Sequence, residues 1–232
     1  MKDETKIIDF HAHILPGADH GSDGMEMTAK QMALMNDAGV DTVVATPHFY
    51  PNRHSTEFFI QKISESADKL VSAEIERPKL CIGTEVLFCD GLDRMENLNK
   101  LCIRGTDVLL LELPNDRWEM PLLETVKRLT KNYTVVLAHI DRYIEHREAE
   151  IDYLLEIGAL AQINASSLFS FSVKRKLKPY VNDGLICAIG SDIHEVDKKV
   201  CMHFTGAKKK LGDEYFAIME RSQKLLDSAE LF

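Results

Sequence analysis

The stretch Ile7-Ile8-Asp9-Phe10-His11-Ala12-His13 determines how the rest of the sequence is interpreted. It is a short apolar run, typical of a buried strand, that ends in two histidines separated by one residue. Residues i and i+2 of a strand point to the same side, so His11 and His13 are expected to present their imidazoles together. Two imidazoles at a strand end suit a transition metal, but a His-x-His pair alone is weak evidence. Whether this pair binds a metal therefore depends on which side chains lie at the ends of the other strands.

The composition limits the class of protein. The 232 residues are 45% hydrophobic and carry a formal net charge of −9. This balance argues against a surface for nucleic-acid phosphates, which needs a basic patch. No run of about 18 apolar residues occurs, so no membrane insertion is expected. Residues 1–6 contain no signal-peptide core, and the five cysteines are odd in number and lack C-x-x-C spacing. We therefore expect a cytoplasmic protein with reduced thiols.

Apolar, strand-like segments alternate with helical patterns along the chain. After the opening stretch, strands are expected at 41–46, 80–84, 107–111, 133–138, 160–163 and 185–189. Helices are expected at 25–38, 56–73, 120–131, 148–157 and 171–180, with two more between 196 and 226 that break near Gly212.

This order of elements predicts an α/β fold. Residues 97–103 are expected to form a hairpin or an irregular insert. Neither a linker nor a repeat interrupts the pattern, so one domain is expected over residues 1–232. Nearly continuous apolar strands separated by helices indicate a parallel sheet. A closed or distorted barrel and an open doubly wound sheet both satisfy the pattern.

Side chains that bind metals recur where the expected strands end. They are His11, His13, His20, His48, Glu85, Glu112, His139, Asp192 and His194. In a barrel, the carboxyl ends of all strands meet at one mouth. Six imidazoles and three carboxylates are too many for one ion, so two or three ions sharing bridging carboxylates are expected.

Each of these residues also has a purely structural interpretation. A single histidine after a strand is often a hydrogen-bonded loop residue. Glu85 and Glu112 could cap following helices, and Asp192 could be a helix N-cap. These interpretations would have to coincide at six strand ends, and for this reason we favour metal binding.

Clustered metal ions suit hydrolysis of phosphate esters, because they activate a bound water and neutralise charge on the phosphoryl oxygens. Arg142, three residues after His139, is well placed to bind those oxygens with its guanidinium group. Lys198 and Lys199, after His194, are further candidates. Neither the loop of cysteine-dependent phosphatases nor a G-x-x-x-x-G-K-[ST] loop occurs.

A set of short motifs carries a resemblance to a known family. The motifs are His11-Ala12-His13, Thr46-Pro47-His48, Gly83-Thr84-Glu85, Glu112, Ala138-His139-x-x-Arg142 and Ser191-Asp192-x-His194. Together they resemble the PHP (polymerase and histidinol phosphatase) superfamily. The run from Asp9 to Gly21 resembles its CpsB/YwqE branch, which comprises bacterial manganese-dependent tyrosine-protein phosphatases associated with capsule or exopolysaccharide synthesis.

The resemblance implies a distorted (β/α)7 TIM-like barrel with a trinuclear site. It implies one ion on His11, His13, Glu85 and Asp192, a second on His20, His48 and His194, and a third on Glu112, His139 and a bridging Glu85. The implied metal is Mn²⁺, with iron or zinc as alternatives, and Arg142 is the implied phosphate ligand.

Two positions depart from the pattern of that branch. His20 stands where the branch usually has aspartate, although histidine occurs there elsewhere in the superfamily. Lys199 stands in place of a second phosphate-binding arginine. A lysine supplies a point charge without the planar fork of arginine, so the substrate preference is less defined.

The resemblance implies a phosphatase that uses a metal-activated hydroxide on phosphotyrosine in proteins. The implied partner is the phosphorylated tail of a tyrosine kinase that controls polysaccharide export. The alternatives are a small-molecule phosphomonoesterase of the histidinol-phosphatase type and a non-catalytic metal-binding regulatory module. An enclosed pocket would favour the small molecule, and a shallow mouth would favour a protein tail.

Overall fold

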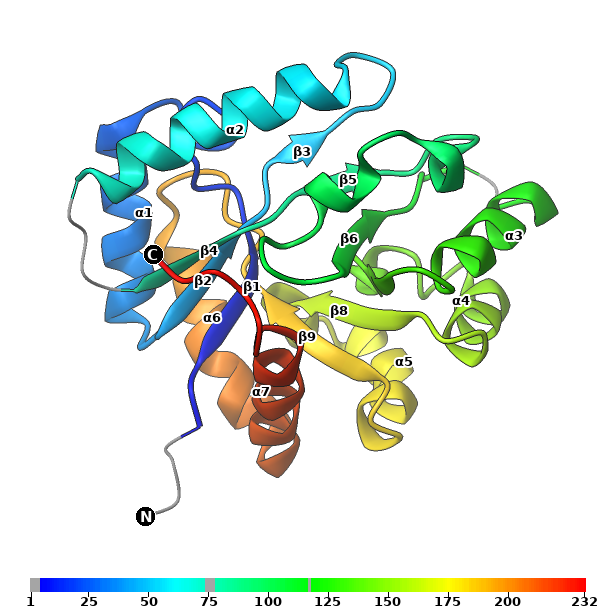
Figure 1. Cartoon of the computed structure of the whole chain (residues 1–232). Helices are drawn as coiled ribbons and strands as arrows, with labels where there is room; N and C mark the ends of the chain where they lie inside the picture. Colours follow the sequence, from blue (N-terminus) through cyan, green and yellow to red (C-terminus); the bar gives the residue numbers. More distant parts are fainter. Residues whose placement is uncertain (1–4, 74–77, 117) are drawn as a thin grey trace.

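The computed structural model describes residues 5–73, 78–116 and 118–232, in which helices surround a group of parallel strands (Figure 1). The strands are β1 (Ile8–Ala12), β2 (Thr42–Ala45), β3 (His48–Phe49), β4 (Lys79–Ile82), β5 (Glu85–Leu87), β6 (Val108–Glu112), β7 (Thr134–Leu137), β8 (Leu160–Asn164) and β9 (Ile186–Gly190). The helices are α1 (Met25–Asp37), α2 (Thr56–Val71), α3 (Met120–Leu129), α4 (Glu148–Glu156), α5 (Phe171–Asn182), α6 (Lys198–Leu211) and α7 (Asp213–Leu225). Four 3₁₀ helices are η1 (Leu92–Arg94), η2 (Leu98–Leu101), η3 (Ile140–Arg142) and η4 (Ala165–Phe169).

The strands form two parallel sheets that together make a distorted barrel. One sheet has the order β1-β2-β4, and the other has the order β3-β5-β6-β7-β8-β9. The ring closes between β9 and β1, where Asp192 N–H donates to the His11 carbonyl at 2.8 Å and His13 N–H donates to the Ile193 carbonyl at 3.0 Å. The predicted (β/α)7 barrel is therefore confirmed, and the open doubly wound sheet is wrong.

Two of the seven predicted strands, 41–46 and 80–84, are each followed by a break and then by a second short strand that was not predicted. The chain leaves β2 at Thr46-Pro47 and resumes as β3, and it leaves β4 at Gly83-Thr84 and resumes as β5. Each break moves the chain from the first sheet to the second. As a result, His48 and Glu85 begin short strands instead of ending long ones.

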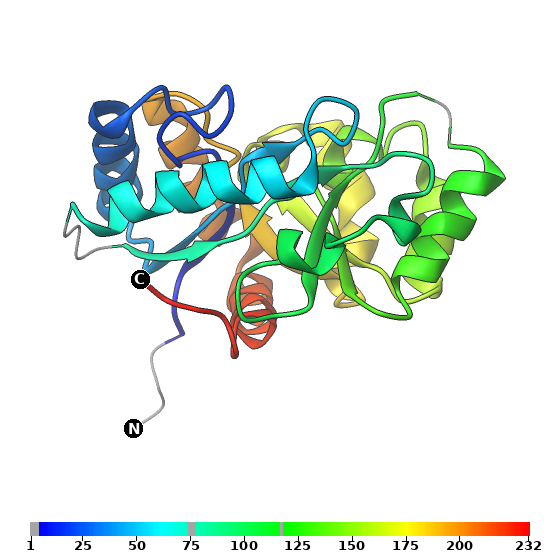
Figure 2. The same cartoon turned by 45° about the horizontal axis from the view of Figure 1, so that its top comes forward.

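The helices form where their apolar faces repeat, and their packing fixes the loops near the barrel mouth. In α2, Ser55 caps the N-terminus by accepting from Phe58 N–H at 3.3 Å. Its buried face includes Ser66, whose hydroxyl donates to the Pro16 carbonyl at 2.8 Å and so holds the loop after β1. In Figure 2, α1 and α6 lie side by side, while α3 and α4 contact each other at the opposite end.

The insert and the last residues of the chain fill a gap between β4 and β6. The insert contains η2 where a hairpin was the alternative, so the hairpin prediction is wrong and the irregular insert is confirmed. Arg104 N–H donates to the Ile82 carbonyl at 2.8 Å. Leu80 and Phe232 exchange two backbone hydrogen bonds of 3.0 Å, so the terminal segment lies along β4 (Figure 1).

No helix in the described ranges is long and apolar enough to cross a membrane. The expected single domain over residues 1–232 and the expected absence of a signal core in residues 1–6 include residues 1–4, which lie outside the described part of the chain, as do 74–77 and 117. Both expectations stay predictions.

A substitution at Gly105 tests the contact between the chain that follows the insert and the terminal segment. Its φ is +81°, and an added Cβ would lie 2.4 Å from the Ser228 carbonyl oxygen. Gly39 has a similar φ of +78°, with open space around the added Cβ. We expect Gly105→Ala to lower the free energy of unfolding by about 1–3 kcal/mol more than Gly39→Ala, because both substitutions strain the backbone but only the first overpacks. Urea unfolding followed by circular dichroism measures both, and equal losses would contradict this packing.

Candidate metal centre

His11 and His13 lie side by side at the end of β1, as their spacing predicts. Both residues are fully buried, and their Nε2 atoms are 3.0 Å apart. Gly190 allows this approach, because an added Cβ there would lie 2.5 Å from the His11 Cβ. Gly21 has the same effect at the other histidine, since its added Cβ would lie 2.4 Å from the His13 Cβ.

Glu85 and Asp192 complete a first group of ligand atoms around this pair. Glu85 Oε2 lies 3.2 Å from His11 Nε2 and 3.4 Å from His13 Nε2. Asp192 Oδ1 lies 3.8 and 3.4 Å from the same two nitrogens. Atoms that bind one ion at about 2.1 Å are about 3.0–3.4 Å apart in octahedral or tetrahedral geometry. The four side chains thus fit a single transition-metal ion.

The arrangement of His48 and Glu85 gives a second sign of an ion. His48 Nδ1 and Glu85 Oε2 are only 2.8 Å apart. Both atoms are buried, yet neither has a hydrogen-bond partner among the described residues. Buried polar atoms without partners are costly, and each such pair needs an explanation. A cation that both atoms face would satisfy them.

Glu85 is shared between several groups. Its Oε2 faces His11, His13 and His48, whereas its Oε1 lies 2.7 Å from His139 Nε2. Glu112 also lies near this histidine, with its Oε1 3.7 Å from His139 Nε2. A carboxylate whose two oxygens face different sets of ligands has the geometry of a bridging ligand.

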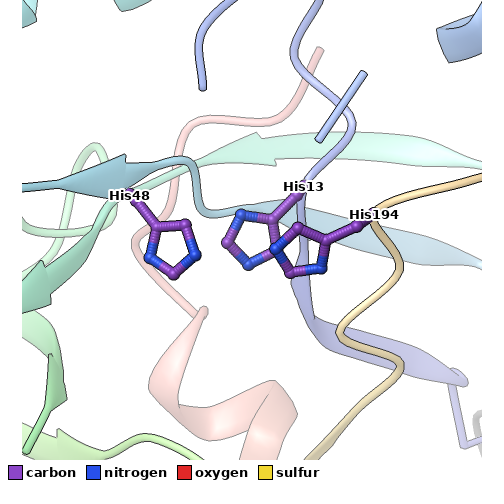
Figure 3. A group of neighbouring side chains, drawn as sticks. All are labelled: His13, His48 and His194. Atoms are coloured by element: carbon purple, nitrogen blue, oxygen red, sulfur yellow. The ribbon is translucent and has the colours of Figure 1, made fainter. Parts of the chain in front are cut away.

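Three imidazoles from separate segments form a further group. The side chains of His13, His48 and His194 point toward a common space (Figure 3), and their ligand nitrogens lie within 4.8 Å of one another. His20 is exposed and groups instead with His48 and Asp19. The observed groups therefore overlap through His48, whereas the predicted second ion had His20, His48 and His194 alone.

All nine predicted ligands lie at the same mouth of the barrel, and each of them belongs to or borders one of these groups. Their division among individual ions stays a prediction. Two of them have backbone conformations that are uncommon for non-glycine residues, with φ of +34° at His139 and +56° at Asp192. Such strain concentrates at functional sites.

Arg142 reaches the same mouth from η3. Its Nη2 donates to Asp192 Oδ2 at 2.5 Å, and its Nη1 lies 3.5 Å from Glu112 Oε1. Asn164, at the end of β8, also donates to Asp192 Oδ2, at 2.8 Å. These contacts hold Asp192 so that Oδ1 faces His11 and His13. Arg142 is 40% exposed and can therefore reach a ligand in the mouth.

Lys199 stands apart from this group. It is exposed in the first turn of α6, and its N–H donates to Asp197 Oδ1 at 2.8 Å. Asp197 is the N-cap of α6, so the N-cap interpretation of Asp192 is wrong. No hydrogen bond or ion pair joins the Lys199 side chain to another described residue. Its role toward phosphate stays a prediction.

Sequence reasoning missed several residues that support the ligands. Asp19 Oδ2 lies 2.6 Å from His13 Nδ1 and accepts from His48 N–H at 2.9 Å. The buried Gln162 accepts from His139 N–H at 2.6 Å and lies 3.3 Å from His11 Nδ1. The signal for Asp19 was its place in the turn-rich run between two predicted ligands. A polar Gln162 within an apolar strand was the second available signal.

The pKa values reflect the crowding of charge. Burial opposes ionisation of Glu85, but His11, His13 and His139 hold its pKa well below the usual value. Burial and the negative charge of Glu85 raise the pKa of Glu112. Two carboxylates with such opposed shifts indicate a place where a cation would be stabilised.

The cysteines have no part in this site. All five are free, and Cys81, Cys102, Cys187 and Cys201 are buried. Burial raises the pKa of Cys187 to about 12, which disfavours the reactive thiolate. These four cysteines belong to the hydrophobic core, whereas the expected reduced state of the thiols stays a prediction.

The barrel and its mouth define the chain as an α/β-barrel protein with a cluster of candidate metal ligands at the mouth. The chain belongs to the CpsB/CapC family of capsular polysaccharide synthesis, whose model matches residues 7–226. The predicted CpsB/YwqE resemblance is thereby confirmed.

Solved structures share the fold. A structure described with YwqE from Bacillus subtilis and CpsB from Streptococcus pneumoniae, "unique metal-dependent tyrosine phosphatases", is 22% identical, with a TM-score of 0.77 over 97% of this chain and 96% of that one. Histidinol phosphate phosphatase from Lactococcus lactis, complexed with zinc, L-histidinol and phosphate, is 14% identical, with a TM-score of 0.55 over 89% and 94%. A β-aspartyl dipeptidase from Fervidobacterium islandicum is 15% identical, with a TM-score of 0.58 over 94% and 70%. No curated protein matches the chain.

Asp19 provides a test of the support for these ligands. We expect Asp19→Asn to weaken metal affinity about 10–100-fold, because the carboxylate orients the His13 ring and holds the His48 backbone. Isothermal titration of the metal-free protein with Mn²⁺ measures the change. Asp23→Asn is the control, since Asp23 is an exposed residue of the same loop. Equal affinities of the two variants would contradict this role.

Proposed function

We propose that this protein is a metal-dependent phosphatase that hydrolyses phosphotyrosine in proteins. The observation that carries the proposal is the cluster of buried imidazoles and carboxylates with a half-exposed arginine beside it. Phosphate-ester hydrolysis needs these two elements, because cations must neutralise the phosphoryl oxygens and a donor must orient them. Membership of the CpsB/CapC family supports the same activity.

The side chains present fit bound metal ions. His11, His13, Glu85 and Asp192 would hold one ion, and His48, Glu112, His139, His194 and His20 would hold one or two more. Bound ions supply an activated water and charge neutralisation. Nitrogen and carboxylate ligands together suit Mn²⁺, iron or zinc, and we propose Mn²⁺ on the strength of the resemblance.

Arg142 is the residue that would bind and orient the phosphoryl group. Its guanidinium now spans Asp192 and Glu112, with both contacts at the mouth. A phosphoryl group bound there would offer its oxygens to the guanidinium in place of these two carboxylates. A guanidinium binds phosphoryl oxygens in bidentate fashion. Asn164 also donates to Asp192 Oδ2, at 2.8 Å, and this hydrogen bond does not depend on Arg142. Arg142 therefore orients phosphate without releasing Asp192 from its place.

Tyr50 and Arg53 favour an aromatic phosphate ester. The Tyr50 ring stacks on His48, with ring centroids 5.2 Å apart and planes at 20°. The Arg53 guanidinium lies 4.8 Å from the Tyr50 ring centroid. Tyr50 is partly exposed, so its ring can contact a substrate ring beside the site, for example edge to face.

The proposed protein substrate is the phosphorylated tail of a tyrosine kinase in capsular polysaccharide synthesis, acted on in the cytoplasm. The family's role in capsular polysaccharide synthesis supports this choice. A small phosphomonoester is the second candidate, favoured by the fold shared with histidinol phosphate phosphatase.

The proposal predicts metal-dependent phosphate release from phosphotyrosine peptides. We expect His11→Ala and Asp192→Ala to abolish it, because each removes a ligand of the first group. Arg142→Ala should lower kcat by about 10²–10³, as loss of an oriented donor does in other enzymes. His146→Ala, which changes a histidine outside the site, should be silent. Activity that survives in Asp192→Ala, or metal-loaded protein that cleaves no phosphomonoester, would refute the proposal.

Substitutions at Tyr50 test whether its ring favours aromatic over aliphatic phosphate esters. We expect Tyr50→Ala to raise KM for a phosphotyrosine peptide about 2- to 12-fold, because an aromatic contact worth about 0.5–1.5 kcal/mol is lost. Tyr50→Phe should keep the wild-type KM. The KM for glycerol 2-phosphate should not change in either variant. Equal changes for both substrates would show that Tyr50 supports the site without selecting the ring.

A further inference from the structure

A groove with a basic and apolar lining lies outside the metal centre. It has a volume of about 240 Å³ and lies between α5, α6 and the start of α7. Three lysines, Lys174, Lys178 and Lys210, line it together with apolar side chains that include Leu177 and Val181. We call these five residues the basic groove. It lies on a protein whose formal net charge is −9.

The charge of the basic groove is unbalanced. None of its three ammonium groups forms an ion pair within the described part of the chain, whereas neighbouring Lys176 pairs with Glu148 at 2.8 Å. One acidic side chain, Glu214, also lines the groove, but its carboxylate lies 3.9 Å from Arg221. The residues of α5 and α6 include no aspartate or glutamate. Positive charge concentrated in a hollow attracts an anionic partner.

Exposed apolar side chains also occur on α5, on α6 and on η4, which contacts both helices. Phe171, the first residue of α5, is 86% exposed, and Met202 in α6 is 68% exposed. Phe169 is 42% exposed, and its ring centroid lies 4.6 Å from that of His203 and 4.8 Å from the Lys210 ammonium. Exposed apolar side chains that lie next to one another mark interaction sites.

The groove lies on helices that follow two of the strands that end at the barrel mouth. Helices α5 and α6 follow β8 and β9, whose ends supply Asn164 and Asp192, and both helices contact η4. An α5 of 12 residues is about 18 Å long. About six residues of extended chain cover that length. A segment joined to a residue in the mouth can therefore lie along the groove.

We infer that the basic groove, together with the exposed Phe171 and Met202 on the same two helices, is a docking site for an acidic segment of the phosphoprotein substrate that also carries apolar side chains. This inference rests on the proposed function and names how that substrate is held. The groove is smaller than the roughly 300–1,000 Å³ that hold a whole small molecule, so it fits side chains of a longer segment. Its concave shape suits a peptide better than a flat bilayer surface.

The test compares two sets of charge reversals in the full chain. The groove variant is Lys174→Glu, Lys178→Glu and Lys210→Glu. The control variant is Lys69→Glu, Lys100→Glu and Lys131→Glu, three exposed lysines on other elements with the same change of net charge. The probe is a synthetic peptide in which an acidic stretch with one phenylalanine follows a tyrosine by about six residues.

Binding of the unphosphorylated probe, measured by fluorescence anisotropy, tests docking without catalysis. We expect the groove variant to raise Kd roughly tenfold, and the control variant less than about twofold. Added salt should weaken wild-type binding, because two of the three lysines, Lys178 and Lys210, are exposed and Lys174 is only half-buried. Phe171→Ser with Met202→Ser should weaken binding too, unlike Val71→Ser with Met120→Ser, which removes two exposed apolar side chains elsewhere.

Kinetics with the phosphorylated probe completes the test. The groove variant should raise its KM with kcat unchanged, while hydrolysis of p-nitrophenyl phosphate stays at the wild-type rate. The inference is overturned if the wild-type chain does not bind the unphosphorylated probe, if both charge variants behave alike, or if only binding to vesicles with anionic phospholipid is lost. If the probe binds at the groove but no phosphomonoester is cleaved, the proposed activity fails and the docking site remains.

Discussion

The structure depends on one buried carboxylate. Glu85 is fully buried, and imidazoles from four positions surround it: His11, His13, His48 and His139. A charge in this position is unstable unless opposite charge or a metal compensates for it. The four histidines come from both sheets, so the interaction that compensates Glu85 also joins the two parts of the barrel. Its position is set by the break at Gly83-Thr84, where the chain crosses from one sheet to the other.

The backbone around this carboxylate is shaped for close approach. Glycine at 21 and 190 lets the first two imidazoles lie against neighbouring chain, and left-handed backbone at His139 and Asp192 turns these side chains into the mouth. Polar residues outside the nine predicted ligands then hold those side chains in place, with Asp19 contacting two of them. Such supporting contacts limit which rotamers the predicted ligands can adopt.

Much of this organisation could be predicted from the sequence, because it follows from local patterns. Helical periodicity located α1 and α2 to within two residues of their observed ends, and the side chains at strand ends indicated one shared mouth. The breaks within two strands were not predictable, because Thr46-Pro47 and Gly83-Thr84 look like ordinary strand ends until their partners in the second sheet are known. The same holds for Asp19 and Gln162, whose contacts join residues far apart in the chain. Spacing along the sequence reports which side of a strand a residue faces, but it does not report what lies opposite.

Closure of the ring has a consequence for the order of folding. The first strand pairs with chain that follows the ninth, and Ser191 N–H donates to Asp9 Oδ1 at 2.7 Å across 182 residues. During synthesis, the ribosome must therefore release nearly the whole chain before β1 finds its second neighbour. Contacts of such long sequence separation form late and slowly. Until then, His11 and His13 lack Asp192, and a nascent chain brings together only part of the predicted set of metal ligands.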